Sequence, residues 1–102
     1  MEEVKIVGVT DGKLQIALSG DIDLGNADAF FEEVMAAYRE TPCDVLFDCQ
    51  ALNFIDSTTL GTFVKILKAL KTDGRSMRLV GLQAKIKKLF LICSLDRIME
   101  IA

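Results

Sequence analysis

The sequence predicts a single α/β domain in which a mixed sheet of about four to five strands packs against helices. Polar and apolar residues alternate in two early segments that are joined by Asp11-Gly12, a dipeptide typical of tight hairpin turns. After Gly20, stretches with helical periodicity alternate with short apolar runs, as in folds whose later strands are parallel. No linker or repeat divides the 102 residues, so we expect one domain over 1–102, with βαβαβαβ order after the N-terminal hairpin.

The first part of the chain is expected to form the hairpin and one helix. Residues 4–9 are the first strand, and the second strand follows the turn with Leu14, Ile16 and Leu18 on one face. Asn26 is placed to cap a helix that runs to about residue 39, where Thr41-Pro42 ends it. The apolar face of this helix comprises Ala27, Phe30, Phe31, Val34 and Tyr38.

The second part of the chain is expected to alternate strands and helices. Residues 44–49 form a nearly continuous apolar run, which predicts a strand buried on both faces of the sheet. Residues 77–80 are a further strand, and residues 98–101 a last short one. The second helix, which Gly74 ends, is marked by Leu60, Phe63, Val64, Leu67 and Leu70, and the third by Ile86, Leu89, Phe90 and Cys93.

Composition argues against several classes of function. The net charge of −3 and the pI of about 4.8 disfavour direct nucleic-acid binding, and the basic residues 85–88 are expected to be a solvated helix face. The absence of histidine removes the commonest general base and the commonest metal ligand. Cys43, Cys49 and Cys93 are odd in number and form no CxxC pair, so we expect reduced thiols that fill apolar space. We therefore expect no metal and no cofactor.

The sequence also predicts a soluble, cytoplasmic protein without a membrane partner. Its first residues, Met1-Glu2-Glu3, are acidic where the start of a secretory signal would be basic. Its longest apolar stretches are shorter than a membrane span requires.

Three consecutive hydroxyl residues, Ser57, Thr58 and Thr59, follow Asp56 at the expected start of the second helix. Unpaired N–H groups and the helix dipole favour added negative charge there. A nucleophile would need a base, but histidine is absent and Lys65 lies two turns further along the helix. No glycine-rich phosphate loop is present. Two interpretations stay open: a cap formed by Asp56 or Ser57 with both threonines exposed, or a phosphate acceptor.

A second polar loop contains Asp21 and Asp23, directly after the second expected strand. If this strand and the strand before Asp56 are parallel neighbours, the two loops share one end of the sheet. We expect the two carboxylates to be solvated or to face a partner rather than to bind a cation. Phe54 is expected either to be buried under the loop or to be exposed as part of a contact patch.

Two motifs resemble those of a known family. Residues 52–61, Leu-Asn-Phe-Ile-Asp-Ser-Thr-Thr-Leu-Gly, look like the signature of STAS domains, in particular the bacterial anti-sigma factor antagonists. Residues 18–23, Leu-Ser-Gly-Asp-Ile-Asp, are similar to the family pattern L-x-G-[ED]-[LI]-D at the end of its second strand. The resemblance covers nearly the whole chain and implies a STAS-like fold.

The resemblance implies a non-enzymatic binding protein that takes part in partner switching. The family's phosphorylatable serine directly follows the motif aspartate, which makes it Ser57 here. Unmodified members bind an anti-sigma factor, usually a serine kinase, and so release a sigma factor. Phosphorylation by that kinase ends the interaction, and a separate serine phosphatase restores it. The expected partner-binding residues are Asp21, Asp23, Asp56, Thr58 and Thr59, and we expect a monomer when the protein is free.

This chain departs from the family at one position, and other functions stay open. The family usually has glycine where Thr59 stands, and threonine there would stiffen the turn and add bulk at the proposed docking surface. A first alternative is a STAS scaffold subunit of a larger signalling complex. A second, of a different class, is a receiver-like phosphoacceptor domain in which Asp48 at a strand end takes the phosphate. A small hydrolase is the third.

Overall fold

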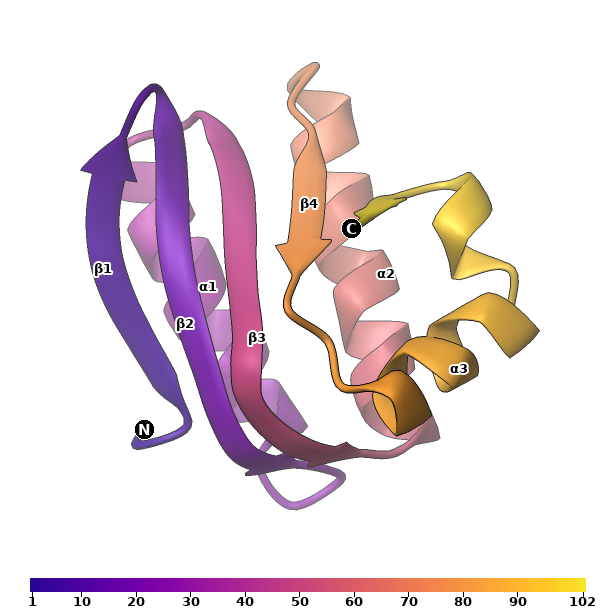
Figure 1. The fold of residues 1–102 in the computed structure, drawn as a ribbon. Coiled ribbons are helices and arrows are strands. Elements are labelled where there is room, and N and C mark those ends of the chain that lie inside the picture. The colour runs from indigo at the N-terminus through magenta and orange to yellow at the C-terminus, as the bar shows by residue number, and fades with distance from the viewer.

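A five-stranded mixed sheet and three helices form the domain in the computed structural model, which describes residues 1–102 (Figure 1). The strands lie in the sheet in the order in which they occur in the chain; β1 and β2 are antiparallel, and all later neighbours are parallel. The predicted fold class is thus confirmed. The elements are β1 (Val4–Thr10), β2 (Lys13–Ile22), α1 (Ala27–Glu40), β3 (Asp44–Ile55), α2 (Ser57–Thr72), β4 (Met77–Val80), α3 (Ala84–Ile92), the 3-10 turn η1 (Leu95–Arg97) and β5 (Glu100–Ile101).

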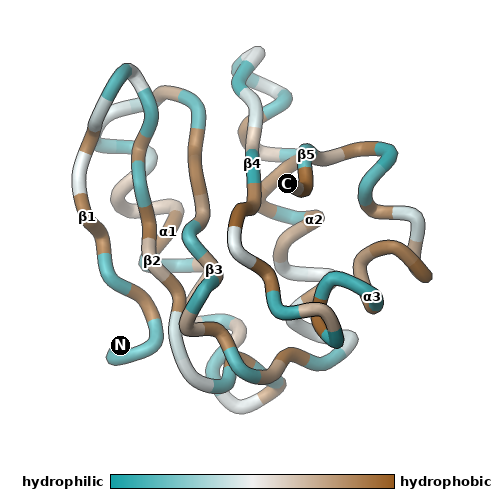
Figure 2. The backbone as a smooth tube through the Cα atoms, viewed as in Figure 1, coloured by the Kyte–Doolittle hydropathy of each residue, from teal (hydrophilic) through white to brown (hydrophobic).

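Helices α1 and α2 cover one face of the sheet, behind the strands in Figure 1. Because the strand order never reverses, right-handed crossovers place both helices on the same side. The other face stays open, and buried and accessible residues alternate along β2 and β3. Figure 2 shows the matching alternation of apolar and polar residues along the strands. The prediction that residues 44–49 are buried on both faces is therefore wrong: Val45, Phe47 and Cys49 are buried, but Asp48 is exposed.

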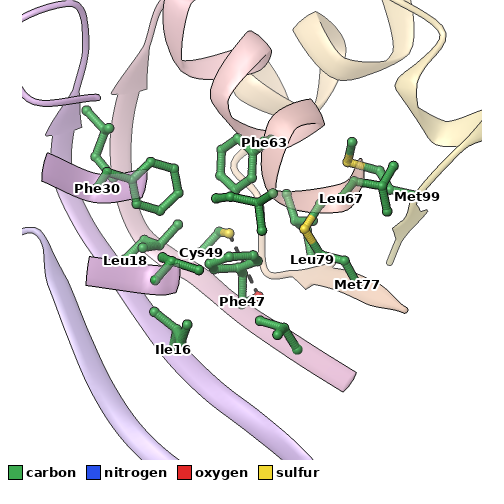
Figure 3. Packing of buried hydrophobic residues seen from close by; sticks show 14 of the residues in the cluster. Ile16, Leu18, Phe30, Phe47, Cys49, Phe63, Leu67, Met77, Leu79 and Met99 are labelled. Carbon is green, nitrogen blue, oxygen red and sulfur yellow. Dashed lines mark hydrogen bonds between the residues drawn. The ribbon is translucent and has the colours of Figure 1, made fainter. Parts of the chain in front are cut away.

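Four phenylalanines form the centre of the core between the sheet and the helices. Phe63 of α2 makes edge-on contacts with Phe30 of α1, Phe47 of β3 and Phe90 of α3, with ring centroids 5.2 to 5.4 Å apart. Figure 3 shows the Phe63 ring beside Phe30 and facing Phe47 and Cys49 of the sheet. One side chain thus joins all three helices to the sheet, in the geometry that aromatic quadrupoles favour.

Several predicted boundaries differ from the structure. The strand that begins at Asp44 continues to Ile55 rather than ending at residue 49, because it pairs with the whole length of β2. The last strand has only two residues, and η1 before it was not predicted. Helix α3 buries only Ile86 and Phe90, while Leu89 and Cys93 are exposed. Cys49 is buried and Cys43 packs against the core while partly buried, but Cys93 is exposed, so the prediction that the thiols fill apolar space is wrong for Cys93.

None of the three helices combines the length and the apolar character that crossing a bilayer requires.

The central position of Phe63 predicts a large loss of stability when its ring is removed. Phe63→Ala deletes three aromatic contacts in a fully buried site and should lower the free energy of unfolding by about 3–5 kcal/mol, measured by urea denaturation. Phe54→Ala is the matched control, because the Phe54 side chain is 49% exposed and should cost about 1 kcal/mol or less. Equal losses in the two variants would contradict the central role of Phe63.

Candidate functional site

The segments that follow β2 and β3 lie together at the carboxyl end of the sheet, at the bottom of Figure 1. The two strands are parallel neighbours, and their last residues, Ile22 and Ile55, are paired. Gly20 has a left-handed φ of 66° where the register between the strands shifts, a conformation that glycine adopts without strain. The prediction that the loops containing Asp21 and Asp56 share one end of the sheet is therefore confirmed.

The carboxylate of Asp56 joins these two segments. One oxygen, Oδ1, accepts the N–H of Thr59 at 3.0 Å and so caps α2. The other oxygen, Oδ2, accepts the N–H of Leu24 at 2.9 Å, across 32 positions of sequence. The Thr59 N–H, followed by that of Leu24, holds the pKa of the Asp56 carboxyl below its usual value. Of the two possible caps, Asp56 is the one that the structure uses.

Thr59 is fully buried, which contradicts the expectation that it lies exposed in the first turn of α2. Its hydroxyl donates to the carbonyl of Ile22, the last residue of β2, at 2.5 Å and lies 3.1 Å from Oδ1 of Asp56. The side chain points inward because it is the third residue of the helix, where that face packs on the sheet. The extra bulk of Thr59 relative to glycine therefore lies under the loops rather than on their outer surface.

The loop between β2 and α1 is braced by its own polar side chains. Asn26 occupies the cap position of α1 as predicted, but its side chain makes no capping bond to the helix. Instead its Oδ1 accepts the N–H of Asp23 at 2.8 Å and its Nδ2 donates to the carbonyl of Asp21 at 2.9 Å. Asp23 accepts the N–H of Gly25 at 2.9 Å. The carboxylate of Asp23 thus helps to shape the loop, whereas that of Asp21 is exposed and accepts no hydrogen bond from the protein.

Ser57 and Thr58 are the two exposed hydroxyl residues at this end of the sheet. They are the first residues of α2, and their own N–H groups have no acceptor within the protein. The next two N–H groups are satisfied, because Thr59 donates to the side chain of Asp56 and Leu60 to its carbonyl. Two free donors and the positive end of the helix dipole therefore surround an accessible serine hydroxyl.

Two exposed apolar residues lie close to Asp56 at the start of α2: Phe54 in the same segment, and Leu24 through its N–H bond to the Asp56 carboxylate. Phe54 is 49% exposed, so of its two expected positions the exposed one holds, and it lines a recess of about 190 Å³ with Lys85, Ile86 and Leu89. Leu24 is 76% exposed, the most of any large apolar residue in the chain. Sequence reasoning missed Leu24, although a leucine between Asp23 and Gly25 in a polar turn was the available signal.

The structure also bears on two other kinds of site, a phosphoacceptor aspartate and a metal site. Asp48 lies in the middle of β3 on the open face, with a hydrogen bond from the N–H of Gln50, and not at the end of a strand. Asp48 therefore does not meet the requirement of the receiver-like alternative for a carboxylate at a strand end. Nowhere in the chain do three His, Cys, Asp or Glu side chains gather into a group that could hold a metal ion.

Comparison with known proteins gives consistent similarities. A family model described as the STAS domain matches residues 5–102. The anti-sigma-B factor antagonist of Bacillus subtilis is 29% identical over 92 residues, which are 90% of this chain and 84% of that protein. An anti-sigma factor antagonist from Mycobacterium paratuberculosis superposes with a TM-score of 0.84 at 19% identity, over 96% of this chain and 82% of that one. SpoIIAA, a Bacillus cell fate determinant solved in its phosphorylated form, gives a TM-score of 0.72 at 21% identity, over 97% and 90% of the two chains.

The hydrogen bonds of Asp56 predict a stability difference that depends on pH. Asp56→Asn should destabilise the protein at neutral pH, because the amide has a single oxygen and can accept from only one of the N–H groups of Thr59 and Leu24, while its NH2 group faces the other. The folded-state pKa is lowered, so this stabilisation is present above the unfolded pKa of about 3.9 and is lost as pH falls through the folded value. Urea unfolding from about pH 7 to pH 3 should show a constant gap to wild type that shrinks below about pH 4.

Asp21→Asn is the control, because the exposed carboxylate of Asp21 accepts no hydrogen bond from the protein and should leave stability unchanged. A gap for Asp56→Asn that stays the same at every pH would show that its carboxylate does not hold the two segments together.

Proposed function

The chain belongs to the STAS domain family, and on that basis we propose that it is an anti-sigma factor antagonist switched off by phosphorylation of Ser57. The unmodified protein binds a kinase-type anti-sigma factor in the cytoplasm and so releases a sigma factor. The same kinase phosphorylates Ser57 and ends the interaction, and a serine phosphatase reverses the modification. The similarity to antagonists from Bacillus and Mycobacterium supports this class of function.

The observation that carries the proposal is the exposed Ser57 at the first position of α2. A phosphate on this hydroxyl can accept from the free N–H groups of Ser57 and Thr58, and it lies at the end of the helix where negative charge is favoured. Thr58 is the second exposed hydroxyl and the secondary candidate. The buried Thr59 hydroxyl is already used by the Ile22 carbonyl, so its phosphorylation would require the loops to open.

The surroundings of Ser57 explain how a phosphate would end partner binding. It adds nearly two negative charges beside Asp56, on the same end of the sheet as the exposed carboxylate of Asp21. The two ion pairs in the structure, Met1 with Glu33 and Arg78 with Glu100, include no residue of this end. Repulsion and bulk that cost a docked partner about 3–4 kcal/mol would weaken binding roughly 10²- to 10³-fold, with no refolding.

The geometry gives no support to a catalytic serine. The only basic side chain that sequence reasoning could pair with Ser57 is Lys65, and its ammonium lies over the ring of Phe31, 4.5 Å from the centroid. An unactivated hydroxyl is a weak nucleophile but a suitable phosphate acceptor for an external kinase. This supports a binding protein rather than a hydrolase.

Phosphosite mapping tests the acceptor directly. Incubation with the cognate kinase-type anti-sigma factor and ATP should place one phosphate on Ser57, because its hydroxyl is exposed beside two free N–H donors. Ser57→Ala should abolish the modification. Phosphate found on no residue from Asp56 to Thr59 would overturn the proposed switch.

The charge of the side chain at position 57 should control the affinity of the protein for the anti-sigma factor. Ser57→Ala should bind the anti-sigma factor about as well as wild type, whereas Ser57→Asp should weaken binding by at least about tenfold, in calorimetric titration. Asp carries only part of the charge of a phosphate, so its effect should be smaller than that of the modification. Equal affinities for the two variants would contradict the electrostatic mechanism.

A further inference from the structure

Leu24 is unusual among the exposed apolar residues of this protein because the loop that carries it is rigidly held. Single exposed leucines are common on protein surfaces and by themselves indicate nothing. Here, however, the N–H of Leu24 donates to Asp56, and the residues on either side are braced by Asp23 and Asn26. An exposed apolar side chain on a backbone that is already held in place costs little backbone entropy when a partner buries it, which suits a binding hot spot.

The position of this loop depends on Thr59. The Thr59 hydroxyl donates to the carbonyl of Ile22, two residues before Leu24, while the Thr59 N–H holds the carboxylate that accepts from Leu24. The end of β2 and the start of α2 are thus fixed to each other by one buried side chain. A glycine at this position, which the related signature usually has, would have no hydroxyl to make the bond to Ile22.

We propose that Leu24 is an apolar anchor for the anti-sigma factor and that Thr59 is a positioning residue that holds it in place. This inference rests on the proposed function and extends it to the partner's chemistry. The carboxylates at this end, Asp21, Asp23 and Asp56, take part in no ion pair. The matching partner surface is therefore an apolar recess that receives Leu24, with a lysine or arginine side chain opposite the exposed Asp21 and no basic side chain opposite Ser57, where a phosphate has to oppose docking.

Titration of the unmodified variants with the kinase-type anti-sigma factor tests the anchor. Leu24→Ala should weaken binding roughly 10- to 30-fold, mainly through faster dissociation. Ile92→Ala is the matched control, because Ile92 is 67% exposed at the end of α3, outside the loops described above, and should change affinity less than about twofold. If Leu24→Ala binds like wild type, the anchor is wrong while the proposed function stands. If wild type itself does not bind, the proposed function and the anchor both fall.

Hydrogen exchange of the free protein tests the positioning role without any partner. Thr59→Val keeps the shape but removes the hydroxyl, so the Leu24 amide should exchange at least about tenfold faster than in wild type, and Thr59→Ser should restore its protection. Thr72→Val is the control, since it removes an equivalent hydroxyl bond to the Lys68 carbonyl near the other end of α2. Unchanged exchange of Leu24 in Thr59→Val would overturn the positioning role.

Discussion

The side chain of Asp56 is the contact on which the candidate site depends. Its two oxygens bind the N–H groups of Thr59 and Leu24, which lie in different segments of the chain, so one carboxylate both starts a helix and anchors a loop. The buried hydroxyl of Thr59 adds a second link, to the carbonyl that ends β2. Without these bonds the pairing of Ile22 with Ile55 would still bring the two segments to one end of the sheet, but no side chain would hold the backbone of Leu24 to the start of α2.

The topology of the sheet sets up this arrangement. Each parallel strand lies next to the one before it, so the crossover helices α1 and α2 cover a single face, and the segments after β2 and β3 emerge together. The phenylalanine cluster around Phe63 locks the helices to that face. The loops are therefore presented by a rigid body, as the proposed switch by phosphorylation requires.

Much of the fold could be predicted from the sequence because local patterns determine it. The Asp11-Gly12 turn, the periodicity of α1 and the strand over residues 77–80 were predicted correctly, and the meeting of the two loops followed from strand order. Two features could not be predicted. The open face of the sheet depends on the order of the strands, which local patterns do not determine, and the burial of Thr59 depends on a hydrogen bond across 37 positions. Periodicity indicates which residues share a face but not what covers it.

In the proposed switch, phosphate on Ser57 changes the surface of a pre-formed site and not the fold beneath it. The amide NMR spectrum of the protein before and after complete phosphorylation by its kinase tests this most directly. Large shift changes are expected only in residues 21–26 and 53–62, with the amides of β1 and the phenylalanine cluster unchanged. Changes that spread through β1 and the core would contradict it, because phosphorylation would then act by rearranging the fold.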